Sequence, residues 1–204
     1  MAYIGKQPTA VPLTSSDLED NIVTSAKIID GTIALADLSA TGTKDATTFL
    51  RGDNTFASAG GENTPYFYAT LSADQTGLTN DTETKLTLAT EIFDTGSEFD
   101  NVTNYRFTPA NGNTYLVSGL VQLKASAAAV LQEARLQFKK NGSTIVEINQ
   151  NTYNNNSTQM APTFQYIITG NGSDYYELFG RAYVSSGTPT IGQRSFFTAF
   201  KLIG

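Results

Sequence analysis

A stretch of amide side chains around one aromatic residue is the part of this sequence best suited to bind a ligand. Residues 149–159 read NQNTYNNNSTQ. Amides donate and accept hydrogen bonds together, as sugar hydroxyls require, and Tyr153 adds a flat apolar face. We predict a long loop here, in which a cell-surface receptor, either a glycan or a protein, contacts Tyr153, Asn154, Asn155 and Asn156. The alternative is a long turn that binds nothing, and both interpretations stay open.

A group of carboxylates could bind a metal ion. Asp94, Glu98 and Asp100 lie close together in the segment EIFDTGSEFDN and could give oxygen ligands to calcium. Their spacing matches no defined calcium-binding loop, so a solvated loop is the favoured interpretation. We therefore expect no metal site and no cofactor, with calcium as the one alternative.

The sequence contains neither Cys nor His. The absence of Cys excludes disulfides and thiolate metal sites. The absence of His removes the commonest general base and the commonest metal ligand, which argues against hydrolytic triads and ordinary zinc sites. We do not expect an enzyme. A glycan-degrading activity would need two carboxylates on opposite sides of a sugar ring, which a sequence cannot show.

The charge distribution limits the possible partners. The net charge is −6, and residues 62–104 carry most of the excess of acidic over basic side chains. A nucleic-acid-binding protein needs basic residues on one surface, so no nucleic-acid partner is expected. No run approaches the roughly 20 apolar residues of a membrane span, and we expect no membrane insertion. The first residues lack a basic leader followed by an apolar run, which indicates synthesis in a cytoplasm.

The elements that must position these residues change in character near residue 61. Before it, aliphatic residues recur every four to six positions, too irregularly for one amphipathic helix. They are Leu18, Ile22, Ile28, Ile33 and Leu38. Such a segment cannot bury its apolar side alone, so we expect neighbouring chains or a scaffold to cover it. These five residues are the predicted attachment site.

After residue 61 the pattern is that of β-strands. Tyr115, Val117, Gly119, Val121 and Leu123 fall on one face of a strand predicted over 114–126. Asn141-Gly142 predicts a hairpin between two alternating segments. About eight short strands separated by turn residues indicate an antiparallel sandwich or jelly roll.

The strand predicted over 175–184 has aromatic residues on both faces. One face can fill the sandwich. The second face, with Tyr175, Phe179 and Tyr183, would then need cover from another copy of the chain.

Residues 65–204 resemble the jelly roll of the C1q/TNF-like family. The resemblance rests on the opening YFYATLS, on YRFTPANGNTYLVSGLVQL, and on the closing segments YYELFG and SFFTAFKLIG. Phe107, Pro109, Gly112 and Tyr115 match the family's pattern at a strand entry. The resemblance implies an all-β, C1q/TNF-like antiparallel jelly-roll sandwich that assembles into a tight trimer.

A second resemblance concerns the N-terminal part. The segment GTKDATTFLRGDNTFA is similar to a linker of bacteriophage tail fibres, with Asn54 where glycine is common and Phe56 where tryptophan is common. The opening MAYIGKQPTAVPLTSSDLEDNIVTSAKIIDGTI is similar to the start of phage fibres, which attaches to the particle. Arg51-Gly52-Asp53 lies inside this linker, so we interpret the tripeptide as part of a joint and not as an adhesion signal.

Together these patterns predict an extended attachment or shaft segment over 1–40, a Gly/Thr/Ala-rich linker over 41–61 and a jelly-roll head over 62–204. The expected function is that of a structural virion fibre protein on the particle surface, a homotrimer that contacts other virion proteins and adheres to a host glycan or protein. The alternatives are a capsid decoration or head-fibre protein of the same architecture and, less favoured, a glycan-degrading tail enzyme.

Overall fold

The structure is a computed structural model that describes residues 24, 26, 28–34, 37, 39–58, 63–125, 130–152 and 157–202. It divides the chain into two compact units, Met1–Ala59 and Gly60–Gly204. The regular structure of the described residues consists of β-strands, without an α-helix. The three segments predicted from the sequence, with their boundaries after residues 40 and 61, stay predictions.

The first unit contains a small hairpin whose turn is the Arg51-Gly52-Asp53 tripeptide. Strands β1 (Thr48–Leu50) and β2 (Phe56–Ser58) pair antiparallel. The Arg51 N–H donates to the Thr55 carbonyl at 2.7 Å, and Asp53 Oδ1 accepts from the Thr55 hydroxyl at 2.7 Å. Asn54 has a φ of 63°, a left-handed conformation open to glycine and asparagine. This explains how asparagine replaces the usual glycine there.

Glycine is required at residue 42 of the same unit. Thr41 bridges Thr55 in parallel, and the Phe56 N–H donates to the Thr41 carbonyl at 2.7 Å. Gly42 has a φ of +91°, and a Cβ added to it would lie 2.3 Å from the Phe56 carbonyl oxygen. The Phe56 ring, in the place of the usual tryptophan, lies 5.8 Å from the Lys44 Nζ.

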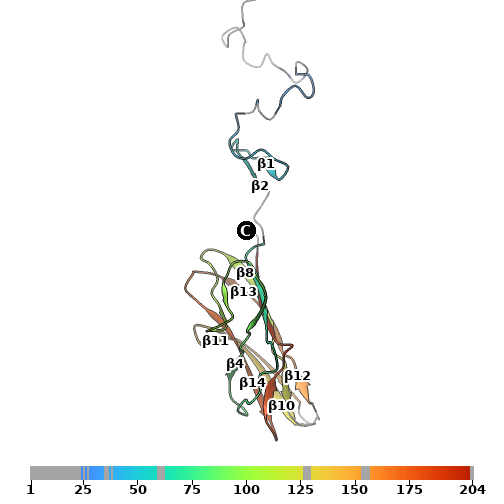
Figure 1. The fold of residues 1–204 in the computed structure, drawn as a ribbon, viewed down its shortest axis with the longest axis vertical. Coiled ribbons are helices and arrows are strands. Elements are labelled where there is room, and N and C mark those ends of the chain that lie inside the picture. Colours follow the sequence, from blue (N-terminus) through green and yellow to red (C-terminus); the bar gives the residue numbers. More distant parts are fainter. Residues whose placement is uncertain are drawn as a thin grey trace, which may run out of the picture. The chain divides into compact units, whose positions relative to one another are not determined.

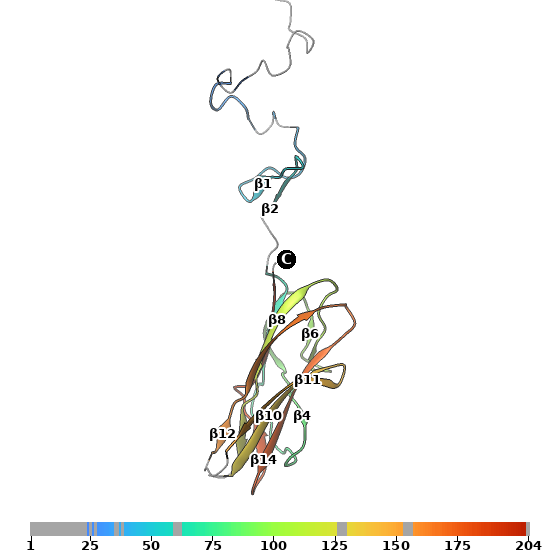
Figure 2. The same cartoon turned by 180° about the vertical axis from the view of Figure 1, so that it is seen from behind.

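The second unit is built from two main antiparallel sheets and a small one (Figures 1 and 2). The first sheet has the order β11-β10-β14-β7-β6, with β4 also paired to β14. Its strands are β4 (Thr84–Lys85), β6 (Phe99–Asp100), β7 (Arg106–Phe107), β10 (Leu131–Lys140), β11 (Ser143–Asn151) and β14 (Tyr176–Val184).

The second sheet has the order β13-β8-β16-β3-β5. Its strands are β3 (Tyr66–Thr70), β5 (Thr90–Asp94), β8 (Thr114–Leu120), β13 (Thr163–Thr169) and β16 (Phe196–Lys201). The small sheet contains β9 (Leu123–Ala125), β12 (Gln159–Met160) and β15 (Pro189–Ile191). This double-sheet arrangement confirms the predicted antiparallel jelly roll.

The hydrophobic core lies between the two main sheets. Tyr115, Val117, Gly119, Val121 and Leu123 are all buried, as their shared face predicts. Aromatic rings from the two sheets meet here: the centroids of Phe67 and Phe107 are 4.7 Å apart. Alternation along each strand therefore leaves one outward face per sheet, and those faces are available for binding.

The Asn141-Gly142 hairpin is confirmed, whereas the strand predicted over 114–126 is interrupted. Asn141 and Gly142 have φ values of 49° and 80°, as a tight hairpin turn requires. The 114–126 segment ends one strand at Leu120 and begins the next at Leu123. Between them, the Gln122 N–H donates to the Ser195 hydroxyl at 2.9 Å instead of to a neighbouring strand.

Candidate functional site

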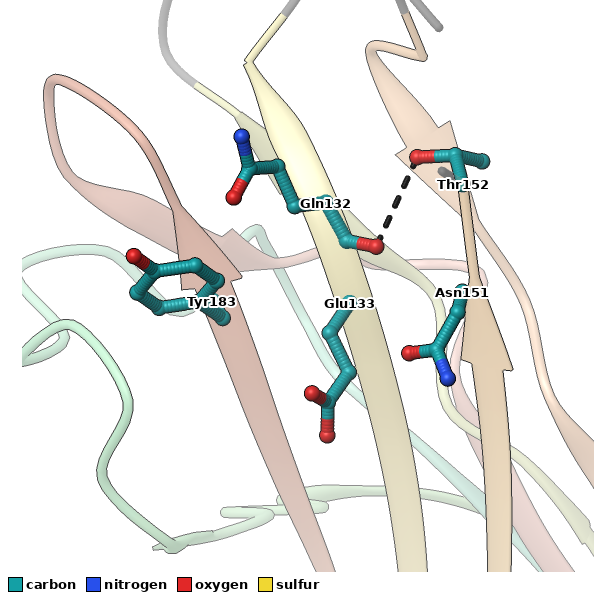
Figure 3. A pocket seen from close by; sticks show the side chains of 5 residues that line it. All are labelled: Gln132, Glu133, Asn151, Thr152 and Tyr183. Atoms are coloured by element: carbon teal, nitrogen blue, oxygen red, sulfur yellow. Dashed lines mark hydrogen bonds between the residues drawn. The ribbon is translucent and has the colours of Figure 1, made fainter. Parts of the chain in front are cut away.

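Three side chains from three strands form a row on the outward face of the first sheet. Glu133 on β10 is paired with Asn151 on β11 and with Tyr183 on β14. Directly opposite residues of an antiparallel pair place their side chains on the same face, close enough to touch a common ligand. We call Tyr183, Glu133 and Asn151 the polar row. Figure 3 shows Glu133 between the other two.

A β-bulge adds a fourth side chain to the polar row. Leu131 and Ala134 are both buried, so Gln132 and Glu133 between them both face outward. The β10–β14 register shifts at this point, which makes Gln132 the extra residue. Bulges of this kind redirect side chains and are common beside functional sites.

Thr152 forms hydrogen bonds that hold the bulge in place. Its backbone N–H donates to the Gln132 carbonyl at 2.9 Å. Its hydroxyl donates to the Leu131 carbonyl at 2.9 Å and lies 3.5 Å from the Gln132 carbonyl, the contact drawn in Figure 3. These bonds join the end of β11 to the start of β10, so the bulge is held from both strands.

The polar row, Gln132 and Thr152 line an open pocket with a volume of about 290 Å³. Tyr183 is 41% exposed, so its ring is accessible from solvent. Small-molecule sites start at roughly 300 Å³, and the pocket therefore has the size of a small ligand such as one sugar unit.

The charged groups around the pocket are paired with one another. Glu133 Oε1 accepts a hydrogen bond from Arg135 Nε and another from Asn149 Nδ2 at 3.2 Å. Arg135 also forms an ion pair with Glu147, with 3.5 Å between Nη1 and Oε1. The hydrogen bond to Glu133 raises the pKa of Arg135 above its usual value. The Glu133 carboxylate is therefore paired within the chain.

A second arginine lies beside the first on the neighbouring strand. Arg181 on β14 is paired in register with Arg135 on β10. Its guanidinium donates to Asp81 Oδ1 from Nε at 2.9 Å and also pairs with that oxygen from Nη2 at 2.7 Å. Both arginines thus have carboxylate partners within the chain.

The outward face of the second sheet has a different character, since it carries aromatic and aliphatic side chains. We call this set the aromatic face: Tyr66, Tyr68, Phe93, Leu116, Leu120, Ile167, Phe196 and Phe200.

Its residues form rows across the strands. In one row, Ile167, Leu116, Phe200 and Tyr66 are successive register partners. The Tyr66 and Phe200 rings stack with their centroids 5.8 Å apart. Ile167 is 60% exposed and Phe200 is 41% exposed. An apolar surface of this kind on a protein head indicates a contact with another protein surface.

We expected the second face of the 175–184 strand to be uncovered, and the structure corrects this expectation for Tyr175 and Phe179. Phe179 is only partly exposed because Lys139 lies over it, with Nζ 4.3 Å from the ring centroid. Tyr175 is likewise covered by the Arg106 guanidinium, 4.5 Å from its ring centroid. Long basic side chains thus cover this face within the chain, and Tyr183 lines the polar pocket. The uncovered apolar surface belongs to the second sheet.

The three carboxylates considered for calcium hold turns together. Asp94 Oδ2 accepts from the Phe99 N–H at 2.8 Å, and Glu98 Oε1 accepts from the Tyr115 hydroxyl at 2.7 Å. The N–H groups after Asp100, with that of Thr103 first, lower the pKa of Asp100 to about 2. Among the described residues, no three or more Asp and Glu side chains are grouped as a metal ion would require.

The predicted receptor-binding residues, Tyr153, Asn154, Asn155 and Asn156, lie outside the described residues. The loop predicted over 149–159 is shorter than expected, because β11 continues to Asn151 and β12 begins at Gln159. Asn151 and Thr152 from that stretch do reach the pocket. Sequence reasoning missed Gln132, Glu133 and Tyr183, and only the hairpin register could have indicated Glu133.

Of the predicted attachment residues, Leu18, Ile22 and Leu38 also lie outside the described residues. Ile28 and Ile33 are described and are 41% and 56% exposed. No helix in the described part of the chain is long and apolar enough to cross a membrane.

Comparison with known proteins gives structural likenesses only. No family model and no curated protein sequence matches the chain. Similar solved structures include the globular domain of the zebrafish complement 1qA protein, with 13% identity over 68% of this chain and 94% of that one, and a TM-score of 0.43. Another is the Eiger TNF of S. frugiperda, with 12% identity over 68% of this chain and 90% of that one, and also a TM-score of 0.43. These likenesses concern the fold and say nothing about binding partners.

Proposed function

We propose that this chain is a structural fibre protein of a bacteriophage virion. Its jelly-roll unit assembles into a homotrimeric head, and the head adheres to a glycan on the host surface without a catalytic step. The N-terminal unit attaches the head to other virion proteins.

The observation that carries the proposal is the aromatic face. Its exposed and half-buried rings and aliphatic side chains cover several strands of one sheet, while the core of the same unit is already filled. The cover we propose is a surface of neighbouring copies, since a closed ring of three joins two different patches of the subunit at each contact. The C1q/TNF-like resemblance of residues 65–204 supports three as the number of copies.

Two features support attachment through the N-terminal unit. Ile28 and Ile33 are exposed there, as expected of residues that a partner covers. The hairpin around Arg51-Gly52-Asp53 lies within the segment that resembles a phage fibre linker, and its turn residues are engaged in the hairpin's own hydrogen bonds. The tripeptide therefore has a structural role within the proposed joint.

In the proposed trimer, adhesion comes from three copies of the polar pocket. Each copy in a trimer carries one pocket, so three weak sites on one rigid head act together. Effective concentration then gives firm attachment without a tight individual site.

Two experiments on the virus that encodes this chain test the proposal. Antibody against the jelly-roll unit should label the surface of intact particles, and purified full chain should slow their adsorption by occupying the receptor. Label restricted to the capsid would support the same head as a capsid decoration protein instead of a tail fibre. Unlabelled particles together with unchanged adsorption would overturn the proposal.

A further inference from the structure

We propose that the polar row is the adhesion site and that it takes an uncharged sugar unit, a neutral hexose or an N-acetylhexosamine. This inference rests on the proposed adhesive function, which it deepens by naming the site and the ligand class. Four properties of the row lead to it: an exposed ring, unused hydrogen-bonding capacity, paired charges and a fixed backbone.

The exposed ring is that of Tyr183. A sugar ring has an apolar side formed by its C–H groups, and an aromatic side chain is suited to cover that side. Tyr183 is 41% exposed and lines one side of the pocket, with Glu133 as its cross-strand partner. A sugar that stacks on Tyr183 would therefore place its hydroxyls beside the Glu133 carboxylate.

The unused hydrogen-bonding capacity belongs to Glu133 and its neighbours. Arg135 and Asn149 donate to Oε1 of Glu133, whereas no described residue donates to its Oε2. Asn151 lies on the other side of Glu133, with an amide that both donates and accepts. A carboxylate oxygen beside an amide matches two adjacent sugar hydroxyls, one donating and one accepting.

The pairing of the charged groups determines the ligand class. Glu133 and Arg135 neutralise each other, Glu147 adds a second carboxylate to Arg135, and Asp81 holds Arg181. An acidic sugar would find both guanidiniums occupied and two further carboxylates close by. A cationic amino sugar would have to share the Glu133 charge with Arg135, which already pairs with it. An uncharged sugar can bind without disturbing these ion pairs, so the row favours it.

The fixed backbone makes the site ready before the ligand arrives. The bulge places Gln132 beside Glu133, Thr152 holds the bulge from β11, and Arg135 with Asn149 holds the carboxylate. Side chains that are already ordered lose little conformational freedom on binding, which favours a measurable affinity from a small contact area.

The test measures binding of the purified full chain to polyacrylamide carriers that bear glucose, galactose, mannose, N-acetylglucosamine or N-acetylgalactosamine. Carriers with sialic acid or with unacetylated glucosamine serve as charged probes. We expect binding to at least one neutral carrier and much weaker binding to the charged ones. Equal or stronger binding to a charged carrier, or binding to none of the neutral carriers, would overturn the assignment of ligand class.

Variants test the position of the site. Tyr183→Ala should weaken binding about tenfold per site, while Tyr183→Phe should retain most of it because the ring remains. Glu133→Gln should also weaken binding. Tyr175→Ala is the matched control, since it removes a tyrosine that lies just before β14 and outside the pocket, and it should bind like the unchanged protein.

The site and the proposed function can fail separately. If the unchanged protein adsorbs to host cells and Tyr183→Ala adsorbs equally well, the adhesive function stands and this site is wrong. If the unchanged protein binds a neutral carrier but does not adsorb to host cells, the sugar site stands and the adhesive function is wrong.

Discussion

Glu133 and Tyr183 lie directly opposite each other on the antiparallel strands β10 and β14. The residue before Glu133, Gln132, is the extra residue of a bulge, so two neighbouring side chains of β10 face outward at this one point. This relationship concentrates a tyrosine, a carboxylate and an amide at the end of the sheet. It is the structural basis of the proposed adhesion site.

Deletion of Gln132 should weaken sugar binding while the jelly-roll unit still folds. Without it, Leu131 and Ala134 would still face the core with Glu133 outward between them. The Thr152 N–H would lose its bond to the Gln132 carbonyl, at a cost of about 1 kcal/mol and a few degrees of melting temperature. We expect weaker sugar binding, because the pocket loses Gln132 and the bond that holds Thr152 beside it. Gln132→Ala keeps the bulged backbone and should bind sugar more strongly than the deletion variant. Equal binding by the unchanged protein, Gln132→Ala and the deletion variant would contradict a role of the bulge in sugar binding.

A charge placed on the aromatic face should separate the subunits. Phe200→Lys and Ile167→Lys each put an ammonium group into the proposed contact, where an unpaired buried charge costs several kcal/mol, roughly a hundredfold or more in affinity. Both variants should elute as single chains on size exclusion at micromolar concentration. Val102→Lys changes an exposed aliphatic residue outside the aromatic face and should leave the assembly intact. If Val102→Lys separates the subunits while Phe200→Lys and Ile167→Lys do not, the aromatic face is not the contact.

Asp100 should make stability depend on acid pH. The pKa of Asp100 in the folded chain is about 2, below its usual value of 3.8, because backbone N–H groups and the Asn104 side chain donate to the carboxylate. A lowered folded pKa means that the stabilisation is complete above the usual value and disappears as the pH falls through about 2. Asp100→Asn should lower the free energy of unfolding at pH 7 by about 1 kcal/mol, as expected for lost charge-assisted bonds. The difference from the unchanged protein, followed by urea unfolding, should shrink between pH 4 and pH 2; a difference that grows would show the opposite linkage.

Loss of two exposed isoleucines should block attachment but not folding. Ile28→Ser combined with Ile33→Ser removes apolar contacts that we assign to a partner on the particle. The jelly-roll unit does not contain these residues, so its melting temperature should be unchanged. Virus particles assembled with the double variant should lack the chain on immunoblots. Normal incorporation would place the attachment contact elsewhere.

The sequence allowed prediction of the strands because alternation and turn residues are local signals. The Asn141-Gly142 turn predicted the β10–β11 hairpin, and alternation placed Leu136 and Phe138 toward the core. The gap between β8 and β9 could not be predicted, because it depends on a bond from Gln122 to Ser195, 73 residues away.

The candidate site was harder to predict for the same reason. The polar row needs the β10–β14 pairing, which joins Glu133 to a residue 50 positions later, and a bulge that alternation alone does not reveal. Alternation also showed a strand with aromatic residues on both faces, but it could not show which face other side chains of the chain cover. Lys139 over Phe179 and Arg106 over Tyr175 cover one sheet, and the aromatic face of the other sheet is left exposed.

The most direct test of the proposed assembly is the mass of the purified full chain in solution. One chain has a mass of 21.9 kDa. Sedimentation equilibrium at micromolar concentration should give about three times that mass, and Phe200→Lys should reduce it to that of a single chain. A stable single chain or a pair of chains for the unchanged protein would contradict the homotrimeric head.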